Sequence, residues 1–194
     1  MNNNQRIRVS TGAIFAAAED FVDRFENVPV SGFQYKMFID EHYDYAAYST
    51  NCRIYSCLLI ENSCRHRWRC RYNEDTILSL DVLKDGDCTI QFNSFLQDKL
   101  GTQLLKGGNT AEFYHSEGTQ DKTKWRDGQL NPEGTINKSK MLVMAHPDVA
   151  FMEFKYGRWH HWVNYEPFKK NKLRLKEDIV IPEGINEYGM KLIS

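Results

Sequence analysis

Arginine alternates with other residue types through the segment Cys64–Tyr72, which reads Cys-Arg-His-Arg-Trp-Arg-Cys-Arg-Tyr. Successive side chains of a β-strand point to opposite sides, so this alternation predicts an arginine-rich strand with one guanidinium face. The guanidinium groups would form a row about 20 Å long, contributed by Arg65, Arg67, Arg69 and Arg71. Guanidinium groups bind phosphates through paired hydrogen bonds, so the row is a candidate ligand-binding face for an anionic small molecule or a polyanion.

The same arginines also have a purely structural interpretation. Charged side chains on the solvated face of a strand commonly pair with acids on the neighbouring strand. Asp81 is expected on the next strand, and Glu74 and Asp75 lie in the turn before it. Parallel guanidinium groups repel one another, so the row requires anions from the fold or from a ligand. The sequence leaves both interpretations open.

Histidines and one carboxylate form the second set of candidate residues. His42 and Asp44 are spaced as H-x-D, and His160 or His161 comes late enough in the chain to be a third ligand. Two imidazoles and a carboxylate can hold iron and leave coordination positions open for substrate and oxygen. An aromatic-rich strand can also carry histidines whose rings are hydrogen-bonded in the core, which is the structural alternative for His160 and His161.

The late segment resembles the second motif of the cupins, G-x-x-H-x-x-x-N, at Gly157, His160 and Asn164. That resemblance implies a small jelly roll in which His160 binds a metal ion. Asn164 would share the strand face of His160 and could meet a substrate there. The resemblance therefore favours His160 over its neighbour as the metal ligand.

The H-x-D frame of His42 and Asp44 resembles that of the 2-oxoglutarate-dependent oxygenases, whose barrel is related to the cupin jelly roll. This resemblance implies that His42, Asp44 and a late histidine bind the metal. Lys172 or Arg174 would bind the carboxylate of the co-substrate. The implied cofactor is a divalent metal such as iron, manganese or zinc.

Cysteine content and charge narrow the class of protein. Five cysteines are an odd number in a chain of this size, which favours free thiols over a disulfide framework. Zinc bound by Cys64, His66 and Cys70 is an alternative to their packing as small apolar side chains. The formal net charge of −1 argues against a globally basic nucleic-acid binder.

Composition and apolar patterning predict one cytoplasmic domain. The chain has 194 residues, of which 41% are hydrophobic and 26% are charged, so a single globular domain over 1–194 is expected. No apolar run is long enough to cross a bilayer, so no membrane partner is expected. Residues 1–5 are expected to be disordered, and 107–138 to form a long polar loop.

Hydrophobic periodicity predicts a mainly β protein. We expect an antiparallel jelly roll or β sandwich of about eight short strands with two peripheral helices. The helices are predicted at 12–26 and 94–106, and the strands at 33–39, 53–61, 64–72, 76–83, 88–93, 140–145, 149–156, 159–165 and 173–181.

Two functional hypotheses follow from these patterns. The first is a small cupin-like jelly-roll protein that binds an anionic ligand and works as a metal-dependent enzyme of the cupin or 2-oxoglutarate-oxygenase type. The second is a non-enzymatic interaction or assembly protein that binds nucleic acid or an acidic partner through the arginine-lined strand. Either hypothesis is compatible with a homodimer, and the sequence does not decide whether the protein is an enzyme.

Overall fold

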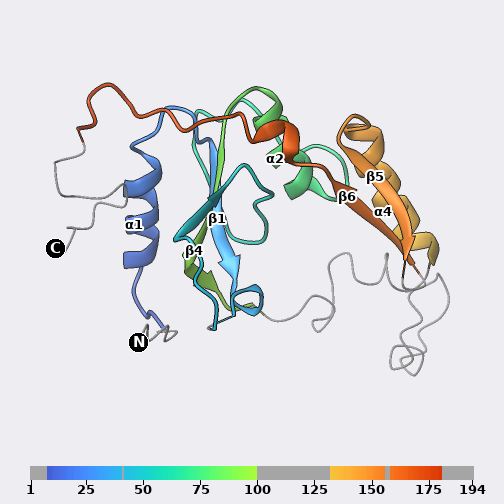
Figure 1. The fold of residues 1–194 in the computed structure, drawn as a ribbon, viewed down its shortest axis with the longest axis horizontal. Helices are drawn as coiled ribbons and strands as arrows, with labels where there is room; N and C mark the ends of the chain where they lie inside the picture. The colour runs from blue at the N-terminus through green and yellow to red at the C-terminus, as the bar shows by residue number, and fades with distance from the viewer. Residues whose placement is uncertain (1–7, 41, 100–131, 156–157, 181–194) are drawn as a thin grey trace.

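The computed structural model describes residues 8–40, 42–99, 132–155 and 158–180. These residues form a mixed α/β structure with three α-helices, six strands and two short 3-10 helices (Figure 1). The helices are α1 (Ala13–Val22), α2 (Glu74–Lys84) and α4 (Pro132–Ala145), and the 3-10 helices are η1 (Lys36–Phe38) and η2 (Glu166–Phe168). The strands are β1 (Val30–Tyr35), β2 (Tyr48–Thr50), β3 (Leu58–Ile60), β4 (Thr89–Gln97), β5 (Ala150–Lys155) and β6 (Arg158–Val163).

The larger sheet contains four strands in the order β2-β4-β1-β3. β1 and β4 are parallel neighbours, and the register between them shifts after Phe33, while β2 and β3 pair antiparallel at the two edges. Parallel neighbours require a crossover connection, and α2 lies within the crossover from β1 to β4. The carboxyl ends of β1 and β4 therefore meet at one edge of the sheet, the lower edge in Figure 1.

Helix α1 covers one face of this sheet. Phe21 of α1 packs into a buried cluster with Phe33 of β1 and with alternate residues of β4, including Ile90 and Phe92. Phe21 is 5.7 Å from Phe92 between ring centroids, in an edge-to-face arrangement that aromatic pairs favour. Burial of a large apolar side chain contributes roughly 1.5–3 kcal/mol, so this contact fixes α1 on the sheet.

Helix α2 is buried on two sides. Leu78 and Val82 pack toward the sheet with Val30, whereas Ile77 and Leu80 belong to a second cluster that includes residues of α4 and β5. The remaining side of the helix is polar, with Glu74 and Lys84 exposed, so α2 lies between the sheet and the unit formed by α4, β5 and β6.

The second sheet is the antiparallel hairpin β5-β6, in register from Ala150 opposite Val163 to Lys155 opposite Arg158. Leu142 of α4 is fully buried in the cluster that joins this hairpin to α2. α4 and the hairpin therefore form a unit that packs against the far side of α2.

After η2 the chain crosses the amino ends of β1 and β4 toward α1, at the top of Figure 1. We call residues 169–176 the C-terminal strap. Leu175 forms an isolated antiparallel bridge with Phe25. The buried side chain of Asn27 donates to the carbonyl of Lys172 at 2.9 Å and accepts from the backbone N–H of Arg174 at 2.8 Å. The side-chain amide of Asn27 therefore makes two hydrogen bonds to the backbone of the strap, of the kind that a neighbouring strand would otherwise make.

Two further asparagines hold the beginning of the strap. The side chain of Asn51 donates to the carbonyls of Phe168 and Asn171 at 3.0 and 2.9 Å. The side chain of Asn171 donates to the carbonyls of Leu83 and Asp87, both at 2.8 Å. The strap is thus joined to α2 and to the residues that precede β4.

The predicted mainly β class and jelly roll are not confirmed, because two segments predicted as strands are helical. Residues 76–83 lie in α2, and 140–145 lie in α4. The cause for α2 is its burial on two sides, which places apolar residues at Leu78, Leu80 and Val82 in an alternation typical of a strand. The segment 64–72 contains no strand.

Several other predicted elements are confirmed within one or a few residues. The helix predicted at 12–26 is α1, and β1, β4, β5 and β6 overlap the strands that were predicted at their positions. Part of the predicted helix 94–106 is wrong, because residues 94–97 continue β4, and its end lies outside the described residues. The predicted disorder of 1–5 lies outside them as well, as does the predicted loop 107–138 up to the start of α4. None of the described helices is long and apolar enough to span a bilayer.

Candidate functional site

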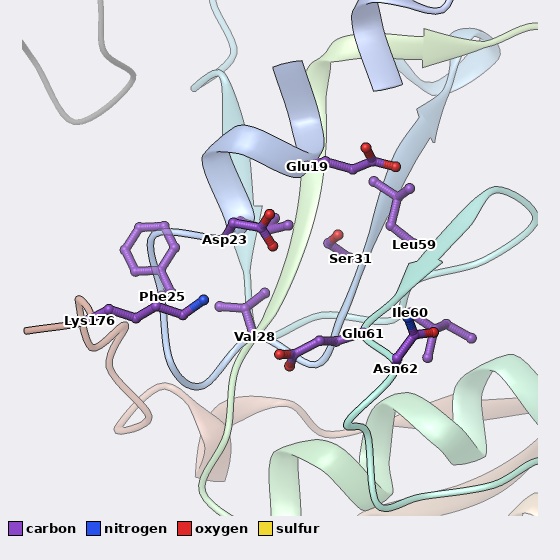
Figure 2. A pocket seen from close by; sticks show the side chains of 11 residues that line it. Glu19, Asp23, Phe25, Val28, Ser31, Leu59, Ile60, Glu61, Asn62 and Lys176 are labelled. Carbon is purple, nitrogen blue, oxygen red and sulfur yellow. The ribbon is translucent and has the colours of Figure 1, made fainter. Parts of the chain in front are cut away.

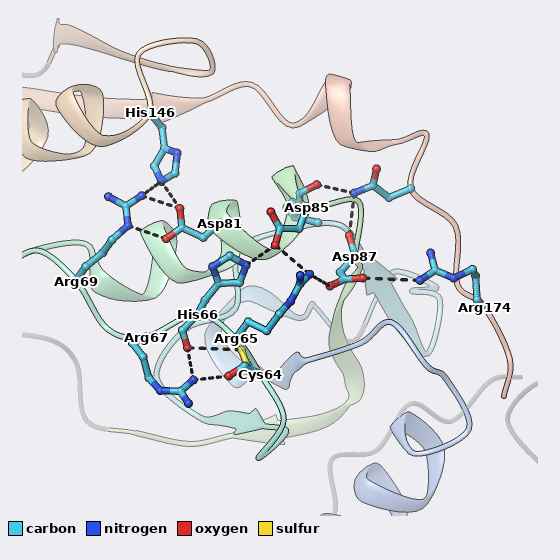
Figure 3. A network of polar contacts seen from close by, with 12 residues as sticks. Cys64, Arg65, His66, Arg67, Arg69, Asp81, Asp85, Asp87, His146 and Arg174 are labelled. Carbon is cyan, nitrogen blue, oxygen red and sulfur yellow. Dashed lines mark hydrogen bonds and ion pairs between the residues drawn. The ribbon is translucent and has the colours of Figure 1, made fainter.

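The predicted arginine strand is an irregular segment that runs beside α2 (Figure 3). Arg69 forms a two-pronged ion pair with Asp81 of α2, with N–O distances of 2.7 and 2.6 Å. Arg65 lies 3.2 Å from Asp85 and 4.0 Å from Asp87. For these two arginines the structural interpretation is correct, although Asp81 lies on a helix rather than on a strand.

The remaining arginines of the segment point to other partners. Arg67 donates to the backbone carbonyls of Cys64 and His66, and Arg71 lies 5.6 Å from the ring centroid of Tyr72. Cys70 has a φ of 67°, which no β-strand contains. The prediction of one guanidinium face is therefore wrong, because the acids of α2 and the local backbone draw the arginines in different directions.

The network around Arg69 contains a buried histidine that the sequence analysis did not single out. His146 is 1% exposed, and its Nε2 accepts a hydrogen bond from Arg69 at 3.2 Å. Burial lowers the pKa of His146, and the nearby Lys84 lowers it further, while Asp81 opposes the shift. His146 is thus a neutral acceptor that joins the arginine segment to the end of α4, a structural role in this fold.

The predicted metal ligands are not assembled into a site. His42 and Asp44 lie in the exposed loop after η1, whereas His160 lies on β6 opposite Glu153. Within the described ranges, no group of three or more His, Cys, Asp or Glu side chains is placed to hold a metal ion. The metal-binding interpretation is therefore corrected, because the H-x-D frame lies in the loop after η1 whereas the late histidine lies on β6 of the second sheet.

The two other predicted ligand-binding residues have partners within the fold. Asn164 accepts a hydrogen bond from the backbone N–H of Glu166 at 3.0 Å, which starts the turn of η2. Arg174 of the C-terminal strap forms an ion pair with Glu26 and lies 3.9 Å from Asp87. Both contacts fix the path of the chain at the amino ends of the parallel strands.

A different group of polar side chains lies along the sheet, from the loop beside the first residues of β4 to the carboxyl end of β1, and we call it the carboxyl-edge site. It contains Gln34 of β1, Gln91 of β4, and Arg53 and Tyr55 from the loop between β2 and β3. In open α/β sheets, ligands bind outside the carboxyl ends of the strands. The topology therefore indicates this edge as the place for a functional site.

A chain of hydrogen bonds orients the amides of the carboxyl-edge site. The hydroxyl of Tyr55 donates to Oε1 of Gln34 at 2.6 Å, and Nε2 of Gln34 donates to Oε1 of Gln91 at 3.0 Å. This order leaves Nε2 of Gln91 without a partner in the described structure, although the residue is only 6% exposed. A buried N–H group without a partner is costly, so a ligand that accepts from it would be stabilised.

Aromatic rings and cations surround this chain of hydrogen bonds. The rings of Tyr35 and Tyr55 have centroids 5.4 Å apart, with Lys99 4.9 Å from the Tyr35 ring and Arg53 4.4 Å from the Tyr55 ring. Lys36 is paired with Asp98 at 2.9 Å. These groups suit a ligand that has both a negative charge and a ring.

Exposed aromatic and apolar side chains follow β1 directly. Four large apolar or aromatic side chains are exposed beyond the end of the strand: Met37 (73% exposed), Phe38 (54%), Tyr43 (65%) and Tyr45 (46%). The centroid of the Phe38 ring lies 5.8 Å from that of Tyr35, so this surface is continuous with the carboxyl-edge site. Exposed rings beside polar groups are typical of binding surfaces.

A cavity of about 260 Å³ lies elsewhere, between α1, the start of β1 and the end of β3 (Figure 2). Its acidic lining residues are Glu19, Asp23 and Glu61, which outnumber the single lysine, Lys176. Carboxylates repel phosphates, and this cavity lies at the amino ends of the parallel strands. We therefore favour the carboxyl-edge site for an anionic ligand.

The residues of the carboxyl-edge site were missed in the sequence because they are common types without a motif. Gln34 and Gln91 were assigned to strands, and Arg53 belongs to no cluster of basic residues in the printed sequence. The signal that could have located them is topological: the parallel pairing of β1 and β4 brings residues about sixty positions apart together. A predicted fold in which β1 and β4 belong to an antiparallel sheet could not reveal that these residues lie together.

Comparison with known proteins supplies the family. The family model of the TET-Associated Glycosyltransferase matches residues 1–108, which include α1, the whole four-stranded sheet and α2. Neither the curated proteins nor the solved structures contain a significant match. The cupin- or oxygenase-type enzyme and the nucleic-acid-binding interaction protein are both wrong as predicted functions, because the matched family consists of glycosyltransferases. Since the match covers more than half of the 194 residues, the chain belongs to the TET-Associated Glycosyltransferase family.

Proposed function

We propose that this protein transfers a glycosyl group from an activated sugar donor to an acceptor hydroxyl, and that the donor binds at the carboxyl-edge site. The observation that carries the proposal is the family match over the four-stranded sheet and α2. The parallel pair β1 and β4 lies inside the matched region, and the carboxyl ends of such strands are where α/β sheets bind ligands.

The chemistry of glycosyl transfer suits the groups at this edge. The bond from the anomeric carbon to a phosphate-type leaving group breaks, and a bond from that carbon to the acceptor oxygen forms. The leaving group departs with the electron pair of the broken bond, and the proton of the acceptor hydroxyl passes to the departing phosphate or to solvent. Cationic side chains near the leaving oxygen stabilise the charge that develops there. Arg53 and Lys99 are cations of the carboxyl-edge site that can serve in this way.

The amides and rings of the site suit the rest of the donor. Gln34 and Gln91 present oriented amide groups, and amides can donate to and accept from sugar hydroxyls. Tyr35 and Tyr55 present aromatic faces that can pack against a ring. An anionic small molecule is thus still the proposed ligand, at residues other than those the sequence suggested.

The full chain should be incubated with a panel of nucleoside-diphosphate sugars, with and without added divalent metal, and the released nucleotide measured by mass spectrometry. Water takes the place of the acceptor hydroxyl in this assay, so it measures hydrolysis of the donor. We expect one donor to be consumed, and Gln91→Leu to reduce its consumption by at least about tenfold, since a lost hydrogen bond to a charged or polar group is worth about 1.5 kcal/mol or more. Asn164→Ala is the control, because its amide accepts from the backbone N–H of Glu166 and, among the described residues, contacts none of the carboxyl-edge site. Absence of both binding and consumption across the panel would refute the proposal.

A further inference from the structure

We propose that Arg53 holds the phosphate-type leaving group of the donor, as a guanidinium that the fold positions before the ligand arrives. This inference deepens the proposed function and rests on it. No sequence pattern marks Arg53, which lies outside the arginine-rich segment of the chain.

The position of Arg53 is fixed on both sides. The backbone N–H of Cys52 donates to Oγ1 of Thr89 at 3.0 Å, and the backbone N–H of Ile54 donates to Oγ of Ser79 at 3.1 Å. These contacts attach the loop to β4 and to α2. The guanidinium carbon lies 4.4 Å from the ring centroid of Tyr55, so the aromatic face orients the side chain as well.

The charge of Arg53 is not neutralised by the part of the protein that the structure describes. The guanidinium is half-buried, and no described carboxylate lies within ion-pair distance of it. By contrast, Arg24, Arg69 and Arg174 each form an ion pair with an acid. The carboxylate of Asp75 accepts instead from the N–H and the hydroxyl of Thr76 at the start of α2.

A partly buried cation without a counter-ion is unfavourable unless an anion joins it. An arriving phosphate therefore gains more at Arg53 than at an arginine that already has a carboxylate partner. The fork of a guanidinium also matches two phosphate oxygens, which fixes the orientation of the leaving group.

Three titratable neighbours of Arg53 (Cys52, Tyr165 and His161) are uncharged near neutral pH and do not neutralise it, whereas Lys138 and Asp75 act as charges in the same region. Burial raises the pKa of the Cys52 thiol to about 12 and raises that of the Tyr165 hydroxyl above its ordinary value. Burial, with the positive charges of Lys138 and Arg53, lowers the pKa of His161 to about 4. Polar interactions are stronger where burial leaves little water to screen them.

The buried N–H of Gln91 provides the second, independent observation. Tyr55, which orients Arg53, donates to Gln34, and Gln34 in turn fixes Gln91 with its Nε2 free. Gln91 also lies 4.0 Å from the sulfur of Cys52, the residue that precedes Arg53. The positive charge of Arg53 and a donor without a partner in the described structure are thus linked through Tyr55 and Gln34, which suits a binding site for an oxygen-rich anion.

Calorimetric titration of the full chain with inorganic pyrophosphate tests the inference directly. We expect the wild-type protein to bind pyrophosphate. Arg53→Gln should raise the dissociation constant by about tenfold or more, because it removes one charge-assisted hydrogen bond. Arg53→Lys keeps the charge but loses the fork, so we expect an intermediate affinity. Arg65→Gln is the matched control, because it removes the same charge from an ion pair with Asp85 and should leave pyrophosphate binding unchanged.

Circular dichroism would confirm that each variant is folded. If Arg53→Gln does not fold, the affinity of Arg53→Lys for pyrophosphate tests the inference. Wild-type protein that does not bind pyrophosphate would overturn the inference, as would an Arg53 variant that binds it as tightly as the wild type. Donor consumption that is unaffected by Arg53→Gln would refute the role of Arg53 and leave glycosyl transfer in place. Pyrophosphate binding that depends on Arg53, in a protein that consumes no donor, would support the anion site and refute the transfer reaction.

Discussion

Replacing Asn171 with alanine should destabilise the protein more than its position on an irregular segment suggests. Asn171 is 9% exposed and lies in the C-terminal strap, outside the region that the family model matches. Its amide donates to the carbonyls of Leu83 and Asp87 at 2.8 Å each, and these residues end α2 and precede β4. The substitution would therefore release the strap from the sheet whose carboxyl edge forms the proposed site.

The magnitude follows from the contacts that are lost. A protein hydrogen bond contributes about 1 kcal/mol net, and a buried group left without a partner costs about 1–3 kcal/mol. The carbonyl of Leu83 keeps a second donor, the N–H of Gly86 at 3.2 Å, whereas no other donor to the Asp87 carbonyl is present in the described structure. Two lost bonds and one unpaired carbonyl together give about 3 kcal/mol of lost unfolding free energy.

Urea unfolding followed by tryptophan fluorescence would measure this difference, with the slope m reporting whether both proteins unfold in the same way. Asn164→Ala is the matched control, because Asn164 is exposed and accepts one local bond from Glu166, so its loss should cost less than about 1 kcal/mol. If Asn171→Ala loses less than about 0.5 kcal/mol at unchanged m, the three-asparagine attachment does not stabilise the fold and the reasoning is refuted.

Two further predictions concern backbone packing and pH. Gly32→Ala would place a Cβ atom 2.2 Å from the carbonyl oxygen of Cys57 and 2.5 Å from Cγ2 of Ile54. We therefore expect thermal unfolding to show a loss of about 1–3 kcal/mol in the free energy of unfolding. Gly12→Ala is the control and should change it little, because no atom lies within 4 Å of the added Cβ. His161 has a folded pKa of about 4, below its ordinary value of 6.5, so the unfolded state binds the additional proton and stability should fall as pH decreases from about 6.5 to 4, by up to about 3 kcal/mol. Unfolding of His161→Gln across this range should lack that part of the pH dependence, and an identical profile would show that His161 is not buried as a neutral ring.

Periodicity predicted the elements that have one buried face and one solvated face. The apolar spacing of Ile14, Ala18 and Phe21 revealed α1, and the alternation of Cys88, Ile90 and Phe92 revealed β4. α2 was missed because seven of its residues are buried, from Thr76 to Leu83, and because Leu78 to Val82 alternate apolar and polar as a strand does. A short apolar run of this kind does not distinguish a strand from an enclosed helix.

The arginine segment shows the same limit for side chains. Its alternation is real in the sequence, but Arg65 and Arg69 turn toward acids of α2 and of the turn after it. Contacts with another element overrode the local pattern, since an ion pair with a fixed carboxylate stabilises more than a row of like charges. The prediction that acids of the fold might pair with these arginines was the more accurate one.

The sequence by itself determined which segments of this protein alternate or repeat with a regular period, and so it located α1, β1, β4 and the β5-β6 hairpin. Only the tertiary structure decided that β1 and β4 run parallel, because strand direction depends on the crossover through α2 and not on the residues of either strand. That pairing brings Gln34 and Gln91 together, with Gln91 beside Cys52, the residue before Arg53. The proposed site therefore exists only in the folded chain, where residues distant in sequence share one edge of a sheet.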